Sequence, residues 1–168
     1  MIIEAILKRR SVREFRTDPV TEDEIGEIIA AAQYAPTAMN RKPVEFVVIR
    51  DEAVRAKLFD ILAKSLRQDS LRTAPVVIVP LADTQKSVLP HFDLAIASEH
   101  LMLQAAELGL GTVWKNIAPE IVPEILALLG VPPHFTLANV IPVGHPKDAP
   151  AAHTPAELEA ARIHPEKW

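Results

Sequence analysis

The sequence predicts an α+β fold, arranged as a three-layer α-β-α sandwich. Helical and strand-like patterns are mixed along the 168 residues without strict alternation, which favours this class. Residues 76–79 read Val-Val-Ile-Val, a run typical of a strand buried on both faces. Residues 92–108 form a helical pattern that is apolar around most of its circumference, so we expect it to be buried on several sides. No repeat or low-complexity linker divides the chain, so we expect one domain over residues 1–168.

The helices are predicted from apolar spacing and from signals at their ends. Thr21 begins a capping box, and the helix after it should stop before Pro36. Asp51 is the N-cap of another helix, whereas Gly109 and Gly130 are suited to close the last two. The predicted helices cover residues 3–10, 22–35, 52–62, 92–108 and 122–129.

The strands are predicted from short apolar runs between the helices. The predicted strands cover residues 44–49, 75–81, 112–114 and 135–143, the last of them broken at Pro142.

Composition excludes several classes of function. The 18 Lys and Arg against 22 Asp and Glu give a net charge of -4, which argues against a general basic field for nucleic acid. The chain has no cysteine, which excludes disulfides, thiolate metal sites and a cysteine nucleophile. No leader peptide and no membrane-spanning segment is visible. We therefore expect a cytoplasmic protein that binds neither nucleic acid nor a membrane.

Basic side chains gather where the first helix ends. Arg9, Arg10 and Arg13 surround Ser11 within five residues. Guanidinium groups match phosphate oxygens in pairs, and a hydroxyl adds a neutral donor. The alternative is a solvated basic stretch that offsets the helix dipole, which spacing alone favours because such clusters are common.

Three further segments could contact a ligand. Residues 35–43 hold Thr and Asn side chains and backbone amides between two prolines. Residues 108–114 contain Gly-Leu-Gly, which lets a backbone approach a flat ligand closely. Residues 143–147 place His145 after the last strand. The alternative for residues 35–43 is a plain connector. The alternative for residues 108–114 is a helix cap followed by a turn. The alternative for residues 143–147 is a simple turn.

No metal ligand and no catalytic side chain is predicted. The six histidines show no metal-ligand spacing, and no Walker loop, Gly-x-Ser-x-Gly or His-Glu-x-x-His motif is present. No pair of carboxylates stands out from helix caps and solvated faces, so glycosidase-type chemistry is not predicted.

Taken together and in this order, these segments resemble the FMN-dependent nitroreductase family, in particular its small members. The resemblance covers nearly the whole chain, and each motif is weak alone although five occur in register. The matching motifs are Arg9-Arg10-Ser11-Val12-Arg13-Glu14-Phe15, residues 35–43, Ala74-Pro75-Val76-Val77, residues 93–114, and Gly144-His145-Pro146 with Lys167-Trp168.

The resemblance implies an intertwined homodimer with two FMN sites at the subunit interface, each lined by both chains. Residues 145–168 would be a tail that wraps the partner. Arg9 and Ser11 would hold the FMN phosphate, and Arg10 would pass the ribityl and ring region. Arg13 would lie at the N1/O2 edge of the flavin, where a positive charge favours the reduced, anionic ring.

The remaining implied contacts come from loops and strand ends around the flavin. They are Pro36, Thr37, Ala38 and Asn40, often from the second subunit, Gln68 in place of an asparagine, Leu110, Gly111 and Thr112 beside the ring, and Gly144 and His145 near the phosphate end.

The sequence departs from the family pattern at several positions. Lys42 replaces a glutamine and Val44 replaces a tryptophan. The phosphate-binding cation of the tail is missing, with His153 or Thr154 in that neighbourhood and Lys147 as a possible substitute. These departures predict weaker FMN binding or a different cation.

The resemblance implies an enzyme that takes a hydride from NADH or NADPH and reduces a small-molecule acceptor by a ping-pong mechanism. Nitroaromatics and quinones are suitable test acceptors. Three alternatives stay open: a flavin reductase or dehydrogenase acting on one metabolite, a flavin-binding or sensing dimer without efficient turnover, and a scaffold that binds no flavin.

Overall fold

An antiparallel sheet forms the centre of the computed structural model, which describes residues 2–64 and 70–168. The strand order is β1-β2-β6-β3, with β5 paired to β2 and β4 paired to β6. The strands are β1 (Val44–Ile49), β2 (Val76–Asp83), β3 (Gly111–Thr112), β4 (Lys115–Asn116), β5 (Phe135–Thr136) and β6 (Asn139–Gly144).

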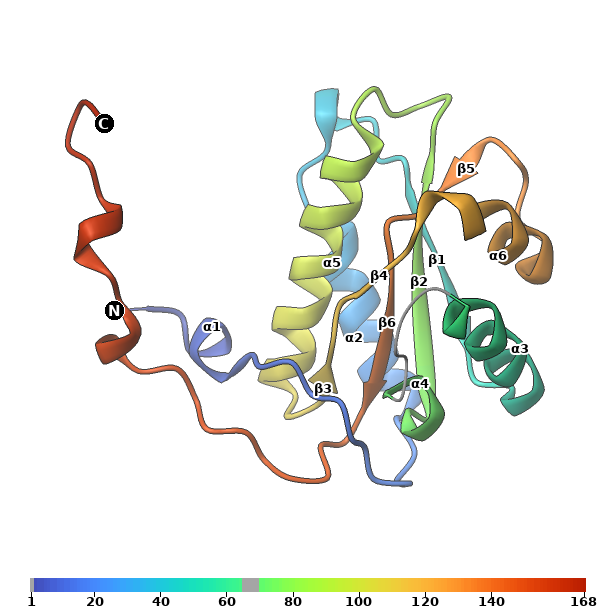
Figure 1. The fold of residues 1–168 in the computed structure, drawn as a ribbon, viewed down its shortest axis with the longest axis horizontal. Helices are drawn as coiled ribbons and strands as arrows, with labels where there is room; N and C mark the ends of the chain where they lie inside the picture. Colours follow the sequence, from blue (N-terminus) through green and yellow to red (C-terminus); the bar gives the residue numbers. More distant parts are fainter. Residues whose placement is uncertain (1, 65–69) are drawn as a thin grey trace.

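Helices cover both faces of the sheet. Helices α2 (Glu22–Gln33) and α5 (Pro90–Glu107) pack on one face, and α3 (Glu52–Ala63) and α6 (Val122–Leu129) pack on the other (Figure 1). The shorter helices are α1 (Glu4–Lys8), α4 (Ser70–Thr73), η1 (Ala38–Asn40), η2 (Pro119–Ile121), η3 (Pro155–Glu157) and η4 (Ala160–Arg162). The predicted three-layer α+β sandwich is confirmed.

Strand β2 connects the two apolar cores. All of its residues are buried, as the Val-Val-Ile-Val run predicted. Val77 and Val79 pack with α3 and α6, whereas Val76 and Ile78 pack with α2 and α5. Full burial of such a side chain stabilises the fold by roughly 1.5–3 kcal/mol, so this strand carries much of the stability of both cores.

The structure confirms the residues that were predicted to cap the helices. The Thr21 hydroxyl accepts from the Glu24 amide at 3.2 Å, and the Glu24 carboxylate accepts from the Thr21 amide at 2.7 Å. The pKa of Glu24 lies below its ordinary value because that carboxylate accepts the backbone hydrogen bond. Asp51 accepts from the Val54 amide at 2.9 Å. Gly130 closes α6 in the left-handed conformation, with φ at 65°.

Two strand predictions needed correction. The strand expected over residues 135–143 is divided into β5 and β6, and Pro142 lies within β6 rather than ending it. Residues 143–144 pair with β3 and residues 139–140 pair with β4. Pro142 lies between these two pairings, where a residue without an N–H is tolerated. Of the strand expected over residues 112–114, only Thr112 is in a strand: β3 ends there, and β4 begins at Lys115.

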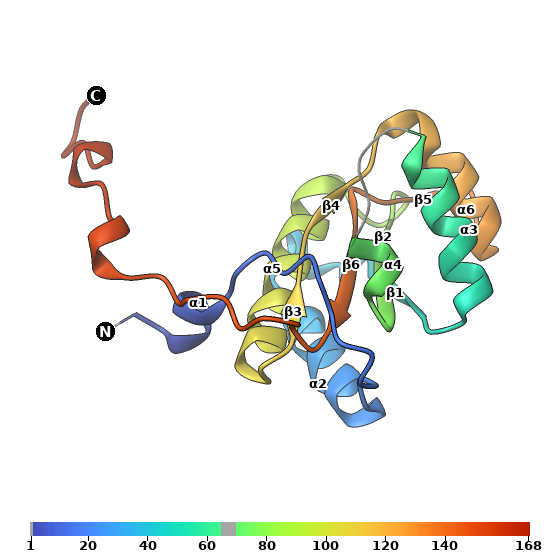
Figure 2. The ribbon, with the colours of Figure 1, turned by 60° about the horizontal axis from the view of Figure 1, so that its bottom comes forward.

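Both ends of the chain leave the sandwich. Residues 2–17 run along its base, and the tail of residues 145–168 passes α1 and projects away from it (Figures 1 and 2). The tail is joined to the N-terminal segment by the hydrogen bonds from the His153 amide to the Leu7 carbonyl and from Arg10 to the Ala151 carbonyl. Leu158, Ile163 and Trp168 are exposed in the tail. Among the described residues, no helix has the length and apolar character needed to cross a membrane.

Candidate functional site

The N-terminal segment forms hydrogen bonds with the edge of the sheet. The Val12 amide donates to the Thr112 carbonyl at 2.9 Å, and the Arg16 amide donates to the His145 carbonyl at 2.9 Å. Ser11 also forms an isolated bridge with Thr112. Three of the predicted site segments, at residues 9–13, 110–112 and 144–145, are therefore neighbours in the structure.

Two glycines allow this close approach. A Cβ at Gly111 would lie 2.7 Å from the Cβ of Val12, and a Cβ at Gly144 would lie 2.7 Å from the Cδ of Pro75 and 3.1 Å from Phe15. The space beside both glycines is thus filled by side chains of the same chain. Backbone contact between residues 110–112 and a flavin remains a prediction.

A basic cavity lies between the end of α1, the end of α5 and the start of the tail. Its volume is about 200 Å³, and Lys8, Arg9 and Arg10 form one side of it. The other lining residues are Val12, Ala106, Gly109, Leu110, Thr112, Pro146, Ala149, Pro150 and Ala152. This composition of cations and backbone fits a phosphate group.

The cations of this cavity have different partners. Lys8 pairs with Glu4 at 3.0 Å, and the hydrogen bond to Glu4 raises the pKa of Lys8 above its ordinary value. The Nε of Arg9 lies 3.8 Å from Glu99, a long contact that a phosphate could replace at small cost. Arg10 donates to the Ala151 carbonyl at 3.1 Å. Arg9 and Arg10 are therefore the better suited phosphate ligands.

Two basic residues near the start of the tail, Lys147 and His153, contact carboxylates. Lys147 pairs with Glu14 at 3.0 Å, and this hydrogen bond raises the pKa of Lys147. His153 contacts Glu157 at 2.7 Å, and this contact is the main reason why the pKa of Glu157 is lowered. The substitution of Lys147 for the missing tail cation thus gains no support from its contacts.

The remaining predicted residues near this end have individual positions. Arg13 is exposed and donates to the Ser11 carbonyl at 3.3 Å. The Nε2 of His145 lies 3.3 Å from the Pro19 carbonyl oxygen. Gln68 lies outside the described residues.

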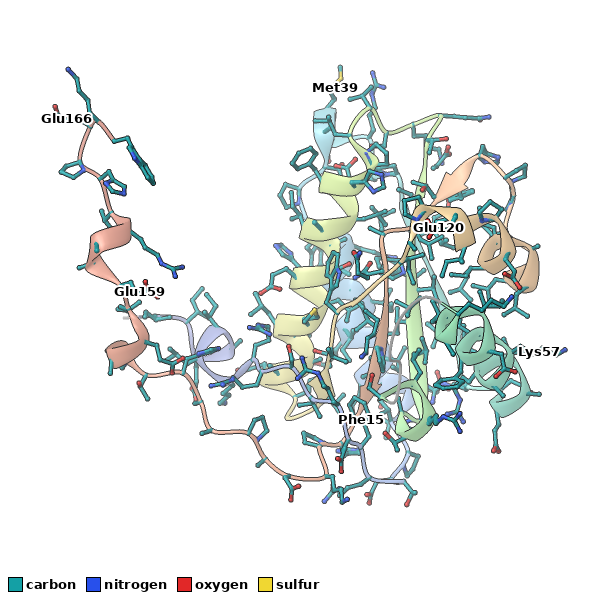
Figure 3. All side chains as sticks on the ribbon, viewed as in Figure 1. Phe15, Met39, Lys57, Glu120, Glu159 and Glu166 are labelled. Atoms are coloured by element: carbon teal, nitrogen blue, oxygen red, sulfur yellow. The ribbon has the colours of Figure 1, made fainter. Side chains whose placement is uncertain are left out.

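The predicted loop of residues 36–40 lies at the opposite end of α5. The Ala38 amide donates to Asp93 near the start of the helix, whereas the basic cavity touches Ala106 near its end. The two positions are thirteen residues apart, which corresponds to about 20 Å at 1.5 Å per residue. Figure 3 shows this separation, with Met39 at one end of the sandwich and Phe15 at the other. One chain therefore does not bring the two groups of predicted residues together.

Asp93 was not among the residues predicted for the site. It is buried, and it holds the loop that contains Pro36, Thr37, Ala38 and Asn40 through the bond to Ala38. The signal that the sequence offered was a carboxylate near the start of the predicted helix of residues 92–108, at the first position of the matching motif of residues 93–114.

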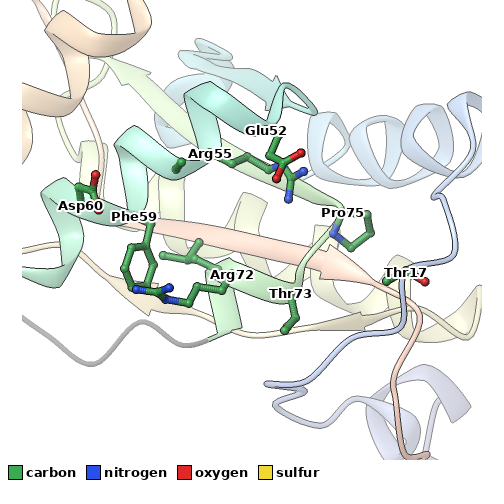
Figure 4. Close-up of a pocket in the computed structure, with 10 residues that line it drawn as sticks. Thr17, Glu52, Arg55, Phe59, Asp60, Arg72, Thr73 and Pro75 are labelled. Atoms are coloured by element: carbon green, nitrogen blue, oxygen red, sulfur yellow. The ribbon is translucent and has the colours of Figure 1, made fainter.

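A larger cavity, of about 480 Å³, lies beside α3 and α4 (Figure 4). The Arg72 guanidinium lies 4.1 Å from the centre of the Phe59 ring, and Glu52 and Asp60 also line the cavity. None of the predicted site residues that the structure describes lines it. Its two carboxylates make it less suited to an anionic cofactor than the basic cavity.

Comparison with known proteins identifies the family. The sequence profile described as the nitroreductase family matches residues 6–70 and 62–145. The chain belongs to the nitroreductase family. The residues matched by the profile include the basic segment, the loop of residues 36–40 and β6, so the resemblance found in the sequence is confirmed.

Individual relatives of this nitroreductase-family chain cover almost all of it. A protein of Methanothermobacter thermautotrophicus, provisionally named an NADH dehydrogenase/NAD(P)H nitroreductase, is 34% identical over 99% of this chain and 87% of its own. The 5,6-dimethylbenzimidazole synthase of Rhodospirillum rubrum is 29% identical over 94% and 88%. The structure of an FMN-dependent nitroreductase from Clostridium difficile R20291 superposes with a TM-score of 0.89 at 27% identity, covering 99% of this chain and 100% of that one.

The glycines at the sheet edge yield a stability prediction for this nitroreductase-family chain. Gly111→Ala and Gly144→Ala should each lower the free energy of unfolding by about 1–3 kcal/mol, because the new Cβ meets atoms with little room to move. Gly26→Ala is the matched control: nothing lies within 4 Å of the new Cβ. Because Gly26 is inside α2, alanine there should raise stability by up to about 1 kcal/mol. Urea unfolding at fixed protein concentration measures all three, and equal effects would contradict the close-packing argument.

Proposed function

We propose that this chain is an FMN-dependent oxidoreductase that takes a hydride from NAD(P)H and passes it to a nitroaromatic, quinone or similar acceptor by a ping-pong mechanism. Family membership supports the enzyme class and the cofactor. The observation that carries the proposal is the basic cavity at the end of α1, where predicted phosphate ligands of the family gather beside β3.

The basic segment is proposed to hold the phosphate end of the cofactor. Arg9 and Arg10 line the cavity and carry planar guanidinium groups that bind phosphate oxygens in pairs. Ser11 lies next to them at the bridge with Thr112 and offers a neutral donor. Backbone hydrogen bonds hold residues 12 and 16 to the sheet edge. The backbone that carries Arg9, Arg10 and Ser11 is therefore anchored close to these residues.

Arg13 is proposed to act on the flavin ring. When bound, FMN supplies the ring that accepts a hydride from NAD(P)H and later gives up two electrons. The reduced ring carries negative charge near its N1 and O2 atoms, and a nearby guanidinium stabilises that charge. Arg13 has the exposure needed to reach a bound ring, since its described contact is with the Ser11 carbonyl. No proton-transferring side chain is required for hydride transfer itself.

The second half of the site is proposed to come from another copy of the chain. The loop of residues 36–40 and the basic cavity lie about 20 Å apart along α5. In a two-fold dimer whose copies of α5 run in opposite directions, the loop of one subunit meets the cavity of the other. Each of two equivalent sites would then contain residues from both chains.

Exposed apolar side chains support this dimer. Apolar side chains on α1, α2, α5 and the tail face solvent in the single chain: Ile2, Ile3, Ile6, Tyr34, Phe92, Ile96, Leu158, Ile163 and Trp168. A groove of about 460 Å³ lies between α1, α2 and α5. Ile3 and Tyr34 line this groove, and a large exposed apolar patch is typical of an interface. We propose that residues 1–168 form one domain and that residues 145–168 wrap around the partner.

One alternative has a specific observation in its favour. The relative from Rhodospirillum rubrum is named for a reaction on one defined metabolite rather than for nitro reduction. A reductase or dehydrogenase with its own metabolite, for which nitroaromatics are incidental acceptors, is therefore the second candidate. A third candidate is a flavin-binding dimer without efficient turnover. The first experiment below would favour it if NAD(P)H does not reduce the bound flavin.

The visible spectrum tests the cofactor and the donor. The purified protein, or the protein after addition of FMN, should show flavin absorption that bleaches on anaerobic addition of NADH or NADPH and returns when a quinone is added. Flavin bands that do not bleach would favour a binding role. Protein that takes up no FMN would contradict the proposal and leave only the family fold.

Charge removal tests the phosphate end. Arg9→Ala should raise the Kd for FMN by about 10–100-fold, because a hydrogen bond to a charged group contributes roughly 1.5–3 kcal/mol. Arg16→Ala is the matched control, since Arg16 is exposed, pairs with Asp18 at 3.1 Å and does not line the cavity. Fluorescence titration of FMN measures both. An unchanged Kd for Arg9→Ala would remove Arg9 from the phosphate site.

Co-assembly of two variants tests the shared site. Arg9→Ala damages the cavity side, and Asn40→Trp places a bulky group on the exposed loop side. Neither homodimer should bind FMN with wild-type affinity. A dimer with one chain of each kind should contain one intact site, so FMN should bind with wild-type affinity at half the stoichiometry. Isothermal titration of doubly tagged dimers measures this, and a total loss of tight binding would mean that each site is built from one chain.

A further inference from the structure

We infer that Asp93 is a positioning residue, which holds the loop of residues 36–42 in the conformation that the flavin of the second subunit requires. This inference rests on the proposed function, because it assumes that the loop reaches an FMN bound mainly by the partner. It concerns a carboxylate that has no part in the proposed hydride transfer.

Asp93 is buried in the first turns of α5, with 2% of its surface exposed. One carboxylate oxygen accepts from the Ala38 amide at 2.9 Å, and the other accepts from the Ser87 hydroxyl at 2.5 Å. Both donors are neutral. Burial of a carboxylate against neutral donors is costly, since water no longer solvates its charge. The two hydrogen bonds offset that cost only while the loop and the segment around Ser87 stay in place.

The loop itself is in a conformation that ordinary residues disfavour. Met39, Asn40 and Lys42 have φ angles of 57°, 53° and 47°. This left-handed region crowds the Cβ of any residue other than glycine. Three such residues within four positions must be stabilised by contacts outside the strained backbone.

Local hydrogen bonds close the turn without attaching it to the sandwich. The Lys42 amide donates to the Thr37 hydroxyl at 3.0 Å, and the Asn40 amide donates to the Thr37 carbonyl at 2.9 Å. The bond from Ala38 to Asp93 attaches the centre of the loop to α5, whereas near the end of the loop the Arg41 side chain makes an exposed hydrogen bond to the Lys86 carbonyl at 3.3 Å. Ser87 extends the attachment, because its hydroxyl also accepts from the Leu89 amide just before the helix.

The loop has little apolar burial to replace this attachment. Met39 is 74% exposed and points away from the sandwich (Figure 3), and Pro36 and Asn40 are also exposed. Loss of the carboxylate should therefore release the loop without unfolding the core. If only a fraction of the released loops has the binding conformation, the apparent Kd for the ligand rises by the inverse of that fraction.

Asp93→Ala is the direct test. One readout is the titration of the dimer with FMN. The other is the amide hydrogen exchange of residues 36–43, measured without added FMN. We expect the Kd for FMN to rise about tenfold or more, as for a loop populated one tenth of the time, with faster exchange in the loop. Asp93→Asn should restore both values to near wild type, because its amide oxygen still accepts from Ala38. Ser87→Ala, which removes one donor and keeps the carboxylate, should give a smaller change of the same sign.

Ser98→Ala is the matched control. Ser98 lies on the same helix, is fully buried and is hydrogen bonded to Asn139 at 3.1 Å rather than to the loop. Its loss should lower the unfolding midpoint without changing loop exchange or FMN affinity. If Asp93→Ala behaves like Ser98→Ala, Asp93 has only a structural role and the inference is wrong. If Asp93→Ala does not fold, unchanged loop exchange in Ser87→Ala overturns it.

Mixed dimers separate this inference from the proposed function. A dimer of Asp93→Ala with Arg9→Ala should keep one wild-type site, since the two defects lie on opposite sides of each site. A dimer of Asp93→Ala with Asn40→Trp should keep none, because both defects lie on the loop side. One intact site in both mixtures would overturn the positioning role. Wild-type protein that binds no FMN would instead overturn the proposed function and the inference with it.

Discussion

The structure depends on covering both faces of β2. This strand lies between β1 and β6, and its side chains alternate between a core formed with α2 and α5 and a core formed with α3 and α6. A strand that is apolar on both sides stays out of water only if helices pack on each face. On one face the cover includes α5, the longest helix within residues 2–64 and 70–168, and on the other face it is α3 and α6.

The length of α5 then determines where the functional segments lie. Its first turns hold the loop of residues 36–42 through Asp93, and its last turn leads through Gly109 to β3 and the basic cavity. The helix separates these two groups by about 20 Å, so a layer that stabilises the fold also divides the proposed site. A second copy in the opposite orientation is the simplest arrangement that joins the two halves.

Sequence patterns predicted the elements whose causes are local. The capping box at Thr21, the cap at Asp51 and the buried run of β2 depend on residues within a few positions of each other, and the structure contains all three. The division of residues 135–143 into β5 and β6 was missed, because it depends on which strands pair alongside. A single sequence does not contain that pairing in any local signal.

The site was predicted through motifs, and its geometry was not. The Gly-Leu-Gly run of residues 109–111 suggested access for a flat ligand, whereas the space beside the Cα atom of Gly111 is filled by Val12. The role of Asp93 was missed for a related reason, since its hydrogen-bond partner Ala38 is 55 residues away. Composition and spacing identify which residues can do chemistry, but tertiary packing decides which of them meet.

The positive charge at the proposed phosphate site comes from a segment that is held by the edge of the sheet, so cofactor binding depends on the fold there. Lys147 and His153 are bonded to carboxylates, so the phosphate would depend on the arginines of residues 9–13. That segment is held by hydrogen bonds from Val12 to Thr112 and from Arg16 to His145, at the edge where Gly111 and Gly144 leave room for Val12, Pro75 and Phe15. A ligand that binds only the assembled pair of chains stabilises that pair by mass action. In the proposed dimer, cofactor affinity and subunit association are therefore linked, and the packing of one sheet edge contributes to both.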